Sequence, residues 1–202
     1  MMLANRRAKP LHHCAIALSL GALAAPHEEI ARRQTTACFL KGTTALPAEV
    51  ANGVAALAKA VTCSAGNSVT GVPAVSSGGI AFSSIDFQKS TKSPLGFALE
   101  TFKAPTNPST ANLATLQDQL NDYLAVEAGI RSLSSTNSAL LTSVKSVKFF
   151  IQYQIARVRT AQGEKLGAAD TVEHQLGKVT KNAIKATAAE IAQVNALAKQ
   201  LK

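Results

Sequence analysis

Apolar residues recur every three or four positions along two long stretches in the C-terminal half of the chain. In residues 110–133 the recurring positions are Leu113, Leu116, Leu120, Tyr123, Leu124 and Ile130. In residues 140–162 they are Leu140, Val144, Val147, Ile151, Ile155 and Val158. This spacing is typical of amphipathic helices, which must bury one face against a neighbour. Two such helices joined by a short polar link predict adjacent members of an up-down helical bundle.

Further helices are indicated on either side of this pair. The stretch from about 43 to Cys63 begins with Pro47 in its first turn and carries an apolar face. A short helix is predicted over 95–103, and a long one over 168–202 that Gly177 could bend. Only 4% of the residues are aromatic, with no Trp, so the core must be built from Ala, Leu, Val and Ile. The predicted fold is therefore mainly α, a bundle of about four to five helices.

Residues 64–92 differ in composition from the helical stretches. Gly, Ser, Thr and Val dominate this insert, and Gly71, Pro73 and the pair Gly78-Gly79 interrupt it. A β-hairpin is one interpretation, in which 69–75 pairs with 80–87. An ordered loop without strands is the other, and the sequence does not decide between them.

The N-terminal segment has the pattern of an export signal. A basic leader precedes an uncharged apolar run of 12 residues, 14–25, which is too short to span a membrane comfortably. Small residues favour cleavage after Ala24, which predicts a signal peptide over 1–24. The dibasic pair Arg32-Arg33 then predicts a pro-segment over 25–33 and a single mature domain over 34–202.

The cysteines agree with export. Of three cysteines, Cys14 falls in the predicted signal peptide, which leaves Cys38 and Cys63 as an even pair in an oxidising compartment. We expect these two to form a disulfide. The predicted location is extracellular, and the mature protein is not expected to span a membrane.

No catalytic, cofactor or metal constellation is evident in the mature part. Its one histidine, His174, lies in the middle of a predicted helix beside Glu173, and there is no G-x-S-x-G motif. Spaced Cys and His ligands for zinc and dense acidic loops for calcium are also missing from the sequence. We therefore expect a protein that is not an enzyme and that has no cofactor.

Two groups of residues are candidates for binding. Phe149, Phe150 and Tyr153 form the densest apolar cluster, either as part of a buried helix or as an apolar patch or pocket. Lys178, Lys181 and Lys185 are spaced to share one helical face, either a solvated face or a docking face for an anionic surface. Residues 34–202 carry 16 basic and 10 acidic residues, a moderate net charge of +6. Because the chain is predicted to be exported and aromatic residues do not alternate with its basic ones, we do not expect nucleic acid as a partner.

Several stretches together resemble uncharacterised small secreted proteins of filamentous fungi. They are the dibasic junction, the Cys38–Cys63 pair around GTTALPAEVANGVAALAKAVTC, and the segments FSSIDF, SPLGFALETF and VKFFIQYQIARVRTAQG. A looser similarity is to the fungal hydrophobic-surface-binding proteins, although the cysteine pair and the insert depart from that pattern. The resemblance implies an effector candidate that acts at a host or cell-wall surface.

Three functional hypotheses follow from the sequence. The first is a secreted, non-enzymatic interaction protein, a fungal effector whose partner is a protein, a cell wall or an anionic surface. The second is a carrier of a lipid or another apolar ligand, and the third is an unrecognised hydrolase. A carrier should show an apolar pocket, a surface binder an exposed patch, and a hydrolase two converging carboxylates or His174 beside a serine.

Overall fold

The structure is a computed structural model that describes residues 37–105 and 107–201. The predicted signal peptide over 1–24 and pro-segment over 25–33, with their processing residues Ala24, Arg32 and Arg33, lie outside the described residues. Within the described part, six α-helices and a small antiparallel sheet surround one hydrophobic core. The expected mainly helical fold with one disulfide is confirmed, with more helices than the four to five predicted.

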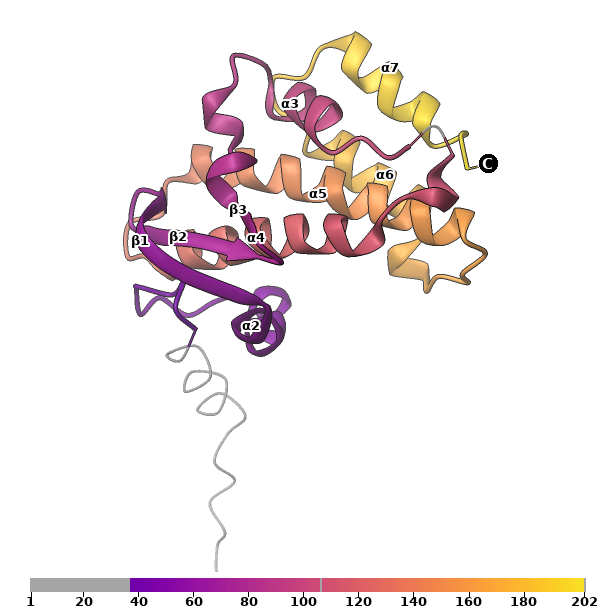
Figure 1. Cartoon of the computed structure of the whole chain (residues 1–202). Helices are drawn as coiled ribbons and strands as arrows, with labels where there is room; N and C mark the ends of the chain where they lie inside the picture. Colours follow the sequence, from indigo (N-terminus) through magenta and orange to yellow (C-terminus); the bar gives the residue numbers. More distant parts are fainter. Residues whose placement is uncertain (1–36, 106, 202) are drawn as a thin grey trace, which may run out of the picture.

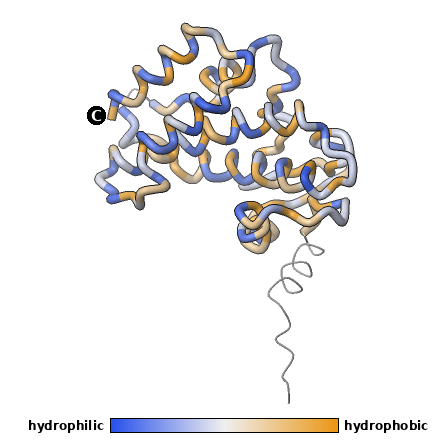
Figure 2. Tube along the Cα trace, turned by 180° about the vertical axis from the view of Figure 1, so that it is seen from behind, coloured by the Kyte–Doolittle hydropathy of each residue, from blue (hydrophilic) through white to orange (hydrophobic). Residues whose placement is uncertain are grey.

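Two long helices form the centre of the molecule, as the apolar stripes predict. Helix α4 spans Leu113–Ser132 and helix α5 spans Ser138–Ala161, and they lie side by side (Figure 1). Each begins at an asparagine cap, where Asn112 accepts a hydrogen bond from the backbone of Thr115 and Asn137 accepts one from Leu140. Burial extends beyond one face, because residues 125–130 of α4 and 153–158 of α5 are all buried. Hydrophobic and hydrophilic residues are interleaved along the chain (Figure 2).

Four shorter helices pack around this pair. Helix α2 spans Ala48–Ala60, α3 spans Pro94–Thr101, α6 spans Val172–Lys181 and α7 spans Ala188–Leu197. Short 3-10 helices lie at Phe82–Ser84, Phe87–Lys89, Pro108–Thr110 and Ala168–Asp170. Helix α5 contacts α3, α4 and α6, and α2 packs on α4.

The single long helix predicted over 168–202 is wrong. Helix α6 ends at Lys181, and a turn that includes Lys185 in a left-handed conformation (φ 55°) separates it from α7. The break is stabilised at Thr187, whose side chain accepts from the backbone of Glu190 while the Glu190 carboxylate accepts from the backbone of Thr187. Such a capping box starts a new helix, here within the stretch that was predicted to be continuous.

The insert forms a three-stranded antiparallel sheet in the order β1-β2-β3. Strand β1 spans Val61–Val69, β2 spans Val72–Ser77 and β3 spans Ile80–Ala81. The turns between them use Gly71, Gly78 and Gly79, all at positive φ. The hairpin interpretation is correct in kind, because β2 pairs with β3, although only through Ser76 and Ser77. The longer partner of β2 is β1, whose residues 61–63 had been expected to end the first helix.

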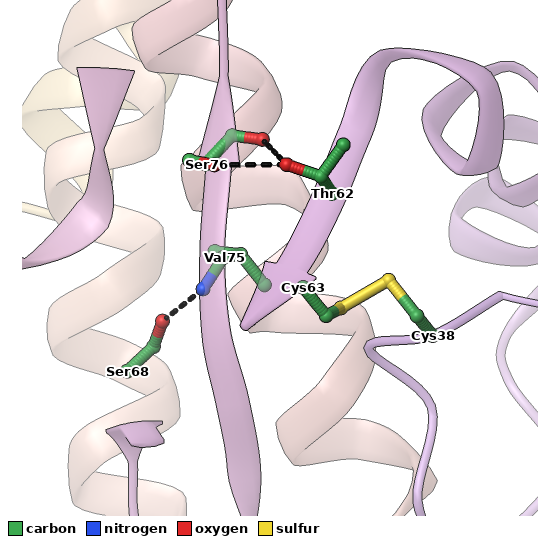
Figure 3. Close-up of a disulfide and its surroundings, with 6 residues drawn as sticks. All are labelled: Cys38, Thr62, Cys63, Ser68, Val75 and Ser76. Carbon is green, nitrogen blue, oxygen red and sulfur yellow. Dashed lines mark hydrogen bonds between the residues drawn. A yellow bond between two sulfur atoms is a disulfide. The ribbon is translucent and has the colours of Figure 1, made fainter. Parts of the chain in front are cut away.

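The disulfide joins Cys38 to Cys63, with the two Cα atoms 6.0 Å apart (Figure 3). Cys63 lies in β1, opposite Val75 of β2, and Cys38 lies in the segment that precedes α2. The bridge therefore encloses the whole of α2 in its loop. Beside it, the ladder is irregular, and the backbone of Val75 donates to the Ser68 hydroxyl at 3.0 Å (Figure 3).

Buried polar side chains tie the outer segments to the central helices. The Tyr123 hydroxyl donates to the carbonyl of Ile85 at 2.7 Å, and the Tyr153 hydroxyl donates to that of Val194 at 3.0 Å. The Arg157 guanidinium is 2% exposed and donates to the carbonyls of Leu197 and Gln200. Leu197 is the last residue of α7 and Gln200 lies three residues beyond it, so Arg157 caps the end of that helix from the core and holds the segment that follows it.

Candidate functional site

A pocket of about 580 Å³ lies between α2, α4 and α5. Its volume is within the range of about 300–1,000 Å³ that is usual for small-molecule sites. Side chains from the three helices and one from α6 line it: Glu49, Val50, Gly53, Ala56, Leu57, Ala60, Gln117, Asn121, Leu124, Glu127, Arg131, Lys145, Lys148, Phe149, Gln152 and Lys178. We call this hollow the α2 pocket.

The wall that α2 presents to the pocket is apolar and made of small residues. The apolar residues of this wall are three, three, one and three positions apart along the helix: Val50, Gly53, Ala56, Leu57 and Ala60. Glycine in the middle of a helix costs about 1 kcal/mol relative to alanine. A Cβ atom built at Gly53 would meet nothing within 4 Å, so the absent side chain leaves open space on this wall.

The opposite wall contains a buried ion network on α4 and α5. Glu127 is 2% exposed, and its carboxylate accepts from the Arg131 guanidinium at 3.0 Å and from the Lys148 ammonium. Burial lowers the pKa of Lys148, the Glu127 carboxylate opposes this shift, and Lys145 and Arg131 add to it by repulsion. One carboxylate thus serves two cations, which leaves a positive charge in the wall.

The aromatic ring of Phe149 is surrounded by ammonium groups. The Nζ atoms of Lys148, Lys178 and Lys145 lie 4.5, 5.7 and 5.9 Å from its centroid. Lysines 145 and 148 come from α5 and Lys178 from α6, two helices that pack together. Cation–π attraction accounts for part of this arrangement, since each such contact contributes about 0.5–1 kcal/mol at exposed sites.

The structure separates the residues of the predicted apolar cluster. Phe149 is partly buried and lines the α2 pocket. Phe150 and Tyr153 are 0% exposed and belong to the core. Phe150 follows Phe149 directly and so points about 100° away from it, into the core. Tyr153 lies four residues after Phe149, and its hydroxyl donates to the carbonyl of Val194 in α7, which places that side chain in the core.

The predicted basic face is also divided. Lys178 lines the α2 pocket, and Lys181 is exposed at the end of α6. Lys185 lies beyond that helix and borders a separate hollow of about 440 Å³ near the start of α3. Pocket residues that the sequence did not single out as a site include Gly53, Glu127 and Arg131. Glu127 and Arg131 carry one signal, an i,i+4 pair of opposite charge.

In residues 37–105 and 107–201, no three His, Cys, Asp or Glu side chains are grouped so that they could hold a metal ion. Over the same ranges, no helix combines the length and the apolar character required to cross a membrane. His174 is exposed on α6, where its backbone donates to the Thr171 hydroxyl.

Comparison with known proteins gives one match. Residues 40–202 match the family model described as Domain of unknown function (DUF7143). This range includes every element that lines the α2 pocket. No curated protein and no solved structure matches the chain.

Proposed function

We propose that this chain, which belongs to the DUF7143 family, is a secreted, non-enzymatic protein that binds a small apolar ligand in the α2 pocket. The observation that carries this proposal is the pocket itself, about 580 Å³ with a continuous apolar wall along α2. Burial of apolar surface is the main driving force for such binding, at about 25 cal/mol per Å². Of the three hypotheses from the sequence, the carrier is therefore the best supported.

Export is part of the proposal, and two observations support it. The Cys38–Cys63 bridge is of a kind that persists in oxidising compartments. The sequence before residue 34 has the charge and hydropathy of a signal peptide followed by a dibasic site. A role at a host or cell-wall surface is compatible with ligand binding, because a secreted carrier can act there.

The arrangement of carboxylates favours binding over hydrolysis. Two carboxylates line the pocket, Glu49 and Glu127. The Glu127 carboxylate is already engaged by Arg131 and Lys148, so it is not free to meet a substrate. His174 is exposed on α6 and does not line the α2 pocket, so it is not placed to act as a general base in that pocket.

The direct test is native mass spectrometry of the protein secreted by its own host. We expect a polypeptide that begins near Gln34, is oxidised at both cysteines, and carries a ligand-sized adduct. A mass that retains residues 1–33 would contradict export. A bare polypeptide that also fails to bind any single-chain apolar probe in solution would contradict the proposed function.

A matched pair of glycine variants then locates the ligand. Gly53→Leu places a side chain in the open space of the pocket, and we expect the adduct to be lost. Gly177→Leu makes the same change at an exposed position of α6, where a Cβ also meets nothing within 4 Å, and should retain it. Both changes replace glycine within a helix, so neither is expected to unfold the protein. Retention of the adduct by Gly53→Leu would place the ligand elsewhere.

A further inference from the structure

We infer that the ligand of the α2 pocket is a single-chain amphiphile with an anionic head group, held by Lys145 and Lys178 beside the Phe149 ring. Its apolar body lies against the small residues of α2. This inference rests on the proposed function and adds the chemical class of the ligand. It follows from the charge, the geometry and the shape of the pocket.

The charge of the pocket lining is unbalanced. Four cations line it, Arg131, Lys145, Lys148 and Lys178, against the two carboxylates Glu49 and Glu127. Glu127 is engaged by Arg131 and Lys148, and no ion pair joins Lys145 or Lys178 to an acid within the described residues. The Glu127 network therefore keeps one positive charge, and Lys145 and Lys178 are the two cations of the lining that no ion pair engages within the described residues. A low-dielectric wall beside them strengthens their attraction for an anion.

The geometry brings the cations to one place. Since the three Nζ atoms lie within 6 Å of the same ring centroid, no two of them can be more than about 12 Å apart. Like charges at such distances repel, and a bound anion would relieve that repulsion. Lys145 and Lys178 are only partly buried, so their ammonium groups can turn towards a ligand without breaking the Glu127 network.

The form of the α2 pocket favours a single bound molecule over a membrane surface as its partner. The α2 wall faces α4 and α5 across a hollow of about 580 Å³, which is the size of a site for one small molecule. A free inorganic anion would leave the apolar wall along α2 exposed to water. An amphiphile fits both the lysines and the apolar wall, because its head group contacts the lysines and its chain covers Val50, Gly53 and Ala56.

Three probes of equal chain length test the head group. Dodecanoate, dodecanol and dodecyltrimethylammonium are titrated into the secreted protein by calorimetry, below their micellar concentrations. We expect dodecanoate to bind at least tenfold more tightly than dodecanol, and the cation to bind most weakly. Equal affinity for all three would overturn the anionic head group and leave the proposed apolar pocket intact. Failure of all three to bind would instead count against the proposed function.

Lysine variants then test which residues hold the head group. Lys145→Gln combined with Lys178→Gln should lower the affinity for dodecanoate at least tenfold and leave that for dodecanol unchanged. Lys181→Gln, on the same helix as Lys178 and outside the pocket, is the control and should change neither. An equal loss for both probes would overturn a head-group role for the two lysines. Sedimentation with phosphatidylglycerol vesicles, without monomeric dodecanoate binding, would overturn the inference in favour of a membrane surface.

Discussion

The buried carboxyl group of Asp122 should make the stability of this fold depend on pH. Asp122 lies in α4 and is 0% exposed, and neither of its oxygens has a hydrogen-bond partner among the described residues. Burial, and to a lesser extent the nearby Asp118, raises its pKa from 3.8 to about 8. An unpartnered charge in this place is costly, so the folded protein favours the neutral acid.

The size of the effect follows from the two pKa values. Because the pKa is raised in the folded state, the stabilising contribution is complete below about pH 4 and is lost as the pH rises to about 8. Each pH unit in this interval changes the free energy of unfolding by about 1.4 kcal/mol. The full interval therefore corresponds to about 6 kcal/mol at most, a large part of the ~5–15 kcal/mol typical of a domain.

The test compares the wild type with Asp122→Asn, which keeps the shape and removes the titration. Urea unfolding followed by circular dichroism gives both free energies of unfolding from pH 4 to pH 9. We expect the free energy of unfolding of the variant, relative to that of the wild type, to increase with pH. At pH 9 the variant should be several kcal/mol more stable. Asp118→Asn should move the wild-type profile to lower pH, since it removes a repelling charge. A difference between the two proteins that stays constant over this range would refute the reasoning.

Four further variants test other contributions to stability. Replacing both Cys38 and Cys63 by alanine should cost about 3.5 kcal/mol in urea unfolding, from a sequence separation of 25 residues, and no change would mean that the bridge constrains nothing. Gly129→Ala should destabilise by about 1–3 kcal/mol, because its Cβ would lie 2.6 Å from Val72 Cγ1 and 2.8 Å from the Phe39 carbonyl. Gly53→Ala should instead stabilise by about 0.5–1 kcal/mol, so thermal melts that shift in the same direction for both glycines would contradict the packing argument. Arg157→Met removes charged hydrogen bonds to the carbonyls of Leu197 and Gln200 and should cost about 1.5–3 kcal/mol. Hydrogen exchange should then quicken at the end of α7, and unchanged protection there would argue against the cap.

The central helices could be predicted because their signals are local and consistent. The stripes of α4 and α5 extend over several turns, and asparagine caps stand at Asn112 and Asn137. Where local signals conflict, the prediction failed. Val61 continues the apolar face of α2 and is also a β-branched residue suited to a strand, and in the structure it is buried opposite Ser77 of β2. Pairing with a strand distant in sequence decided its conformation, and periodicity contains no information about that partner.

The α2 pocket could be predicted only in fragments, for a related reason. Phe149 and Lys178 were noticed by residue type, but on different helices and with no sign that they meet. Gly53 lies nearly a hundred residues before Phe149, so its role as a gap in the opposite wall depends on how α2 docks on α4. Glu127 looked like one of many surface acids on a helix. Its burial follows from the approach of Lys148 on α5, which is a tertiary contact.

The position of α2 links the disulfide to the pocket. Helix α2 buries only Val54 and Leu57 fully, and at about 1.5–3 kcal/mol for each such side chain this is little with which to hold thirteen residues in place. The Cys38–Cys63 bridge encloses the helix and anchors the chain on both sides of it. The apolar wall of the pocket therefore depends on a covalent bond that lies outside the pocket. If this is correct, the double alanine variant at Cys38 and Cys63 should lose affinity for dodecanoate under conditions where α4 and α5 remain folded.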